Sequence, residues 1–128
     1  MTQTGSGVLY NRKQKGQAAE EAAVTYLTSL GHTVLARNWR CRSGEIDIIY
    51  EADGRLFVVE VRSRSHNVMQ GTPEESVNTR KIAQVRSTAA VYLHTTHQTE
   101  RLLSFEVISV RLNKDLSIAS LHHIREAF

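Results

Sequence analysis

Apolar residues recur every three or four positions in two stretches of the chain, which is the spacing of an amphipathic helix. The first stretch, residues 17–31, is rich in alanine and ends at Gly31, a residue that favours helix termination. The second stretch starts at Asn78 and extends to about residue 96. Its apolar stripe comprises Ile82, Val85, Ala89 and Leu93. The pattern therefore predicts two helices that each bury one face.

Other stretches have the composition or the alternation of β-strands. Residues 32–41 and 101–112 each predict one strand, residues 44–64 predict two, and residues 115–128 predict a last strand whose end is poorly defined. The expected order is helix-strand-strand-strand-helix-strand-strand. Interleaved helices and strands are typical of an α/β fold, here a mixed β-sheet flanked by helices.

Residues 44–64 predict a β-hairpin, because Asp53-Gly54 is a favoured two-residue turn. With this turn, one face of the hairpin is entirely apolar and must belong to the core. The opposed pairs on that face are Tyr50 with Phe57, Ile48 with Val59, and Ile46 with Val61. A slip of one residue would mix polar and apolar side chains, so the clean pattern supports this register.

The other face of the hairpin brings two carboxylates together. Asp47 is expected directly opposite Glu60, and Glu45 opposite Arg62. Like charges that face each other across an antiparallel pair destabilise it by up to about 1 kcal/mol. A divalent cation removes this conflict, because Mg²⁺ binds one or two carboxylates together with waters and substrate phosphates. The pair therefore predicts a metal site, with the Val61 carbonyl as a further candidate ligand.

Arg62 lies two residues after Glu60 and so shares its face of the strand. A guanidinium group keeps its proton and can bind phosphate, which makes Arg62 a candidate for holding a scissile phosphate. A plainer interpretation stays open, because many hairpins expose one polar face and Glu45–Arg62 would then be an ordinary surface pair. That interpretation leaves the opposed Asp47 and Glu60 unexplained.

Composition narrows the class of protein. The 128 residues suit one domain, expected at residues 16–128 after a flexible basic arm at residues 1–15. The net charge of +3 permits a polyanionic partner without requiring one. A single cysteine and the lack of a signal peptide or a long apolar run favour a cytoplasmic protein. The common cysteine and histidine metal motifs and the phosphate-binding loop are absent from the sequence.

Basic residues gather around the predicted acid pair along the sequence, on the first strand, beyond Glu60 and at the start of the second helix. They are Arg37, Arg40, Arg42, Arg64, Arg80 and Lys81. A solvated surface is one interpretation. We expect instead a rim that grips a nucleic-acid backbone, because none of these residues belongs to a base-reading motif.

The stretches GEIDII and FVVEVRSR resemble the PD-(D/E)xK motif of restriction-endonuclease-like nucleases. Asp47 matches the first carboxylate, and Glu60-Val61-Arg62 matches the (D/E)xK triplet. More narrowly, the chain resembles the bacterial YraN-like family of uncharacterised proteins. The matching pieces occur in order as KGQAAEEAA, ARNWR, GEIDII, FVVEVRSR, GTPEESV, SFEVISV and HHIREAF.

This resemblance implies a restriction-endonuclease-like fold related to archaeal Holliday-junction resolvases. In that fold a helix-borne glutamate joins the strand carboxylates at the metal, and Glu20 occupies the matching place. The implied cofactor is Mg²⁺ or Mn²⁺. The implied partner is DNA, either branched or bound without sequence specificity, and a homodimer is left open.

Arg62 departs from the nuclease pattern, which has lysine at that position. Arginine keeps the charge but cannot donate or accept a proton during a reaction. Two functions therefore follow from the sequence. One is a metal-dependent nuclease that hydrolyses phosphodiesters, and the other is a catalytically inactive nuclease-fold module that binds nucleic acid or a protein partner.

Overall fold

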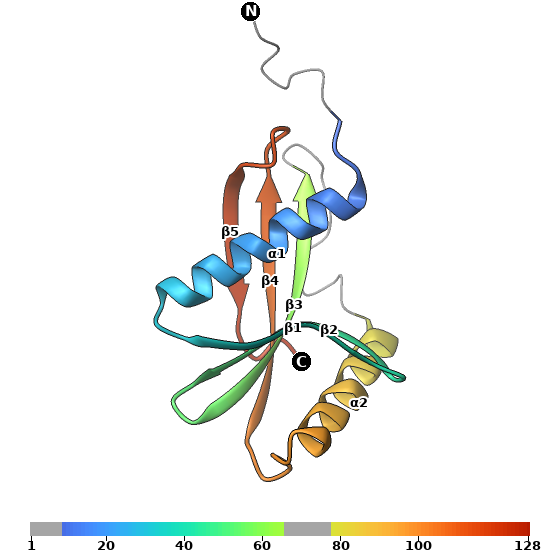
Figure 1. The fold of residues 1–128 in the computed structure, drawn as a ribbon. Helices are drawn as coiled ribbons and strands as arrows, with labels where there is room; N and C mark the ends of the chain where they lie inside the picture. The colour runs from blue at the N-terminus through green and yellow to red at the C-terminus, as the bar shows by residue number, and fades with distance from the viewer. Residues whose placement is uncertain (1–8, 66–77) are drawn as a thin grey trace, which may run out of the picture.

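A computed structural model describes residues 9–65 and 78–128 of the chain (Figure 1). Its elements are α1 (Arg12–Ser29), β1 (Thr33–Cys41), β2 (Gly44–Ala52), β3 (Arg55–Ser65), α2 (Thr79–Thr95), β4 (Leu103–Leu112) and β5 (Ile118–Ile124). This order confirms the one predicted from the hydrophobic pattern. Within the described ranges, neither helix is long and apolar enough to cross a membrane.

The strands form one five-stranded sheet in the order β1-β2-β3-β4-β5. Neighbouring strands are antiparallel except β3 and β4, which are parallel. Parallel neighbours need a long connection, and the stretch that joins these two strands contains α2. The mixed sheet with flanking helices confirms the predicted fold class.

Helix α1 begins at Arg12, earlier than expected. The Asn11 side chain accepts a hydrogen bond of 2.8 Å from the Gln14 backbone amide, and the Gln14 side chain accepts one of 2.9 Å from the Asn11 amide. This capping box satisfies two amides that the first turn of a helix leaves without partners. Residues 12–15, which were expected in the arm, belong to the helix, and the domain boundary at residue 16 stays a prediction. Residues 1–8 of the expected arm lie outside the described residues.

The β2–β3 turn has the predicted form. Asp53 and Gly54 adopt φ values of +52° and +75°, as a two-residue hairpin turn requires. The strands then pair Tyr50 with Phe57 and Ile48 with Val59, in the predicted register.

Both faces of the sheet are covered, one by each helix (Figure 1). The α1 side buries Ala19, Ala23, Leu27, Ile48, Tyr50 and Val59, whereas the α2 side buries Ile49, Leu56, Val58, Val85 and Ala89. Alternate residues of a strand point to opposite faces, so the helices lie on opposite sides. The plainer interpretation, in which the polar face of the hairpin is exposed to solvent, is therefore wrong. Glu60 shares the face of Val58 and is buried on the α2 side.

A network of hydrogen-bonded side chains links α1 to β2, β4 and β5. Tyr26 Oη lies 2.9 Å from His123 Nδ1, and His123 Nε2 lies 2.7 Å from Glu106 Oε1. Tyr50 donates a hydrogen bond of 2.5 Å to the same Glu106 oxygen. Each of these four side chains thus has a hydrogen-bond partner within the network. Polar groups with partners can be buried without destabilising the core.

Candidate metal centre

The β2–β3 hairpin opens at Asp47. Its regular pairing stops at Ile48 and Val59, one residue short of Asp47 and Glu60. Asp47 Oδ2 instead accepts a hydrogen bond of 2.8 Å from the Val61 backbone amide. The Asp47 side chain thus accepts the hydrogen bond that a backbone carbonyl of β2 would accept if the regular pairing continued. The direct cross-strand pairing predicted for Asp47 with Glu60, and for Glu45 with Arg62, is wrong for this reason.

The distortion has a partner in β1. Asn38 adopts a left-handed φ of +50° at the position that the β1–β2 register brings level with Asp47. Asparagine tolerates this conformation better than most residues. Ile46 and Ile48 would share one face of a regular strand, yet they join different core clusters. Strand β2 therefore turns about its own axis at Asp47, and this turn directs the carboxylate towards β3.

Glu60 is only 1% exposed and is held from α2. Its Oε1 lies 3.2 Å from Lys81 Nζ, whereas its Oε2 has no hydrogen-bond partner among the described residues. The first turn of α2 is fixed by the Asn78 side chain, which accepts a hydrogen bond of 2.9 Å from the Lys81 amide. Lys81 was expected on a rim that binds a nucleic-acid backbone. The structure places it against a buried carboxylate instead.

Both acids bind protons more tightly than they would in water. Burial and then the negative charge of Asp47 raise the pKa of Glu60 to about 7, against the opposing effects of Lys81 and Arg62. Burial also raises the pKa of Asp47, although the Val61 amide opposes this shift. A divalent cation would relieve both effects by compensating the two charges and accepting the unpartnered Glu60 oxygen as a ligand. Asp47 and Glu60 therefore fit a Mg²⁺ or Mn²⁺ ion.

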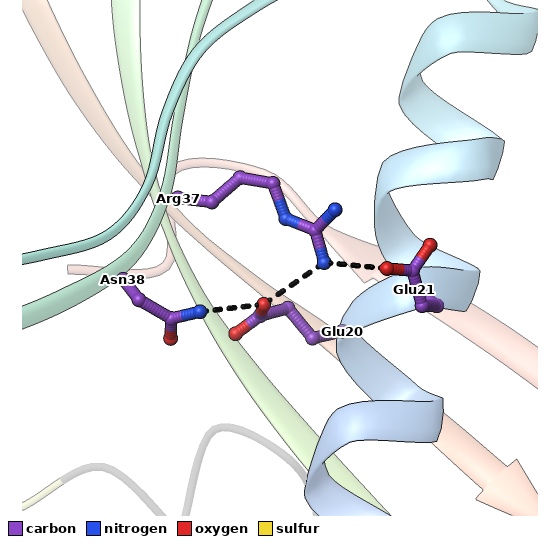
Figure 2. A network of polar contacts seen from close by, with 4 residues as sticks. All are labelled: Glu20, Glu21, Arg37 and Asn38. Atoms are coloured by element: carbon purple, nitrogen blue, oxygen red, sulfur yellow. Dashed lines mark hydrogen bonds and ion pairs between the residues drawn. The ribbon is translucent and has the colours of Figure 1, made fainter.

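Glu20 of α1 is engaged by two side chains of β1 (Figure 2). Its Oε1 accepts hydrogen bonds of 3.0 Å from Arg37 and 2.8 Å from Asn38, and Arg37 also binds Glu21 at 2.9 Å. The charge of Glu20 still contributes to the raised pKa of Asp47. Among the described residues, no group of three His, Cys, Asp or Glu side chains is arranged to hold a metal ion. Glu20 as a third ligand stays a prediction.

The predicted basic rim is divided. Arg37 is tied to acids as described above, and Arg40 Nε lies 3.0 Å from Glu45 Oε2. Arg42, in the turn between β1 and β2, and Arg80, in the first turn of α2, are exposed. The exposed pair is the part of the rim best placed for a phosphate backbone.

Two arginines follow Glu60 along β3. Arg62 is half-buried and level with Ser109 of β4, and its charge lowers the pKa of Glu60. It is therefore close enough to the acid pair for its charge to act on Glu60. Arg64 continues along the same face and is also half-buried.

Removing the Lys81 ammonium tests its contact with Glu60. Lys81→Met is expected to lower the free energy of unfolding by about 2 kcal/mol near pH 8, because it leaves a buried carboxylate without its charged partner. The measurement is urea denaturation of metal-free protein, with Arg80→Met in the same helical turn as the control. In a Glu60→Gln background the loss should nearly vanish. An equal loss in both backgrounds would show that Lys81 stabilises the protein through its aliphatic stem instead.

Comparison with known proteins gives a family without an assigned activity. Residues 19–110 match the family model described as "Uncharacterised protein family UPF0102". A UPF0102 protein of Desulforamulus reducens is 42% identical over 118 residues, covering 91% of this chain and 96% of that relative. One from Moorella thermoacetica is 38% identical over 117 residues, covering 91% and 97%. The matched range contains Asp47, Glu60 and Lys81.

Proposed function

This chain belongs to the uncharacterised protein family UPF0102, and we propose that it is a metal-dependent nuclease that hydrolyses phosphodiesters in DNA. One observation carries the proposal. At the opening of a hairpin, the charge of Asp47 acts on Glu60, both acids have raised pKa values, and Glu60 has an oxygen without a partner among the described residues. Perturbed acids of this kind are found preferentially at functional sites.

Asp47 and Glu60 would hold the ion, and the Val61 carbonyl and Glu20 are its further candidate ligands. A bound Mg²⁺ or Mn²⁺ would supply Lewis-acid stabilisation of the charge that develops on the phosphate and would help to ionise a water molecule. Asp47 is kept in place by the Val61 amide, so one of its oxygens is already oriented.

Two cationic side chains complete the centre. Arg62 binds the scissile phosphate, because a guanidinium group matches the geometry of two phosphate oxygens. Lys81, on α2, contacts Glu60 through its ammonium group. Unlike Arg62, its amine can release and accept a proton. Lys81 therefore supplies the chemistry that the nuclease motif otherwise obtains from a lysine at the position of Arg62.

DNA is the substrate class that the surrounding charge favours. Arg42 and Arg80 are exposed, and Arg64 extends the row of basic residues along β3. Such contacts hold a phosphate backbone without reading its bases, so selectivity would follow DNA structure, for example a branch, and not sequence.

A second candidate is an inactive nuclease-fold module that binds nucleic acid or a protein partner. Arg62 in place of the motif lysine, and Glu20 bound by Arg37 and Asn38, favour this alternative.

Cleavage assays separate the two functions. Branched, single-stranded and duplex DNA are incubated with purified protein and Mg²⁺, Mn²⁺ or a chelator. The nuclease predicts fragments that need the metal and arise fastest from one DNA structure. Salt-dependent binding without fragments under either metal would support the inactive module. A lack of any salt-dependent affinity for DNA would leave only a protein partner.

A further inference from the structure

A hollow lies where the chain after β5 folds back onto β4. Its volume is about 570 Å³, within the range of small-molecule sites. The Ala127 amide donates a hydrogen bond of 2.8 Å to the Phe105 carbonyl and so holds this segment against the strand. Aromatic rings and guanidinium groups both line the hollow, namely Phe57, Phe105, Phe128, Arg55, Arg86 and Arg125.

Two aromatic rings and a guanidinium group lie in contact in this hollow. The Phe105 and Phe128 rings lie 5.2 Å apart with an angle of 32° between them. The Arg86 guanidinium lies 4.8 Å from the centre of the Phe105 ring. Rings and guanidinium planes are the surfaces on which an unstacked nucleobase packs. The geometry thus favours a ligand with a flat π face.

The charges in the hollow favour a ligand that also carries a negative group. Arg125 and Arg86 are exposed, and Arg55 Nη1 donates a hydrogen bond of 2.9 Å to Ser104 Oγ. Two carboxylates, Glu106 and Glu126, also line the hollow, so the three arginines outnumber them. Glu106 is already held by Tyr50 and His123, as described above. An anion is therefore attracted, and a carboxylate can accept a hydrogen bond from a base amino group.

Phe105, Phe128 and Arg86, which line one part of the hollow, lie on the α2 side of the sheet, the side on which Glu60 is buried. Phe105 is level with Val58 and Glu60 is level with Val107, so the two sites are two register positions apart on the parallel strands. Arg86 follows Lys81 along the same helix, α2. A DNA strand with a phosphate at the acid pair would therefore pass close to the hollow.

We propose that this hollow binds an unstacked nucleobase and its phosphate in a single-stranded DNA segment next to the site of cleavage. The proposal rests on the proposed function, because the acid pair supplies the neighbouring phosphate. Binding of a base in the hollow would make the nuclease prefer DNA with unpaired bases over fully paired duplex.

Binding measurements with a chelator present test the hollow without any cleavage. Fluorescence anisotropy compares a single-stranded oligonucleotide with the same oligonucleotide carrying abasic positions, at one fixed salt concentration. Arg86→Ala should weaken binding of the intact strand by about tenfold more than binding of the abasic strand, because stacking on the base is what it removes. Lys114→Ala, an exposed change of equal charge in the β4–β5 turn, is the matched control and should affect both strands alike.

A second variant guards against a general charge effect. Phe128→Leu removes a ring but no charge, and it should also reduce the preference for the intact strand. Equal affinities of the wild type for intact and abasic strands, or equal effects of Arg86→Ala and Lys114→Ala, would overturn the proposal. Binding of deoxyadenosine monophosphate as tight as that of the oligonucleotide would overturn the assignment to a strand.

The proposal for the hollow and the proposal for the cleavage centre can be refuted independently. Metal-dependent cleavage without a preference for intact strands would refute the hollow and leave the nuclease standing. A preference for intact strands that depends on Arg86, without cleavage under any metal, would refute the nuclease and keep the hollow as a binding site.

Discussion

Asp47→Asn is expected to lower metal-dependent DNA cleavage by more than about 100-fold, since even the groups that merely orient metal ligands contribute 10- to 100-fold. The substitution removes the charge that a cation requires. It keeps the size of the side chain and an oxygen that can still accept the hydrogen bond from the Val61 amide. The fold should therefore survive, and the loss would report on the metal centre. The measurement is the initial rate of cleavage in Mg²⁺ and in Mn²⁺, on the DNA structure that the wild type cleaves fastest.

Glu45→Gln is the matched control for this experiment. Glu45 lies on the same strand and also carries one negative charge, but it pairs with Arg40 near the surface. Its removal should leave the cleavage rate close to that of the wild type. DNA affinity measured with a chelator should be similar for both variants. If the cleavage rate falls equally in Asp47→Asn and Glu45→Gln, cleavage depends on the total negative charge of this region and not on an ion shared by Asp47 and Glu60.

The second large effect concerns stability and pH. The pKa of Glu60 is about 7 in the folded protein, above its ordinary value of 4.5, because of burial and the charge of Asp47. The folded state therefore binds a proton more tightly than the unfolded state. Stability from this group is present at low pH and is lost as the pH rises from about 4.5 to about 7. The full loss is roughly 3 kcal/mol for the metal-free protein.

Glu60→Gln should remove this dependence. The variant carries no charge to desolvate, so its free energy of unfolding near pH 8 should exceed that of the wild type by up to about 3 kcal/mol. The difference should shrink towards zero as the pH falls below 4.5, where Glu60 becomes protonated in the unfolded state as well as in the folded state. Urea denaturation of metal-free protein across this range gives the difference directly, and subtracting the wild-type curve cancels the histidines that titrate in the same window.

Adding Mn²⁺ should reverse the order of the two proteins. An ion that binds only the folded wild type stabilises it in proportion to the logarithm of the ion concentration. Glu60→Gln should gain much less from the ion. If the variant is instead less stable than the wild type by about 2 kcal/mol near pH 8, Glu60 acts as a structural hydrogen-bond partner.

Local signals in the sequence predicted the fold well. Asp53-Gly54 set the hairpin register because a two-residue turn with positive φ values permits only one pairing. Asn78 marked the start of α2 through its capping side chain. The Asn11–Gln14 capping box was present in the same way and would have placed the start of α1 correctly.

The details of the site depend on contacts between distant segments, which periodicity does not report. The opening of the hairpin at Asp47 is accompanied by the left-handed backbone of Asn38 in a neighbouring strand. The position of Lys81 depends on where α2 packs. One signal for that packing was available, because the Ile49–Val58 pair is apolar on the face expected to be polar, and an apolar pair needs a cover.

Crystals soaked in Mn²⁺ and measured by anomalous diffraction would test the shared cation most directly. The expected result is an anomalous peak between the carboxylates of Asp47 and Glu60, with Lys81 moved away from Glu60 and no such peak in Asp47→Asn. Lys81 still bound to Glu60 in saturating Mn²⁺, with no peak between the two acids, would contradict the metal centre and with it the nuclease.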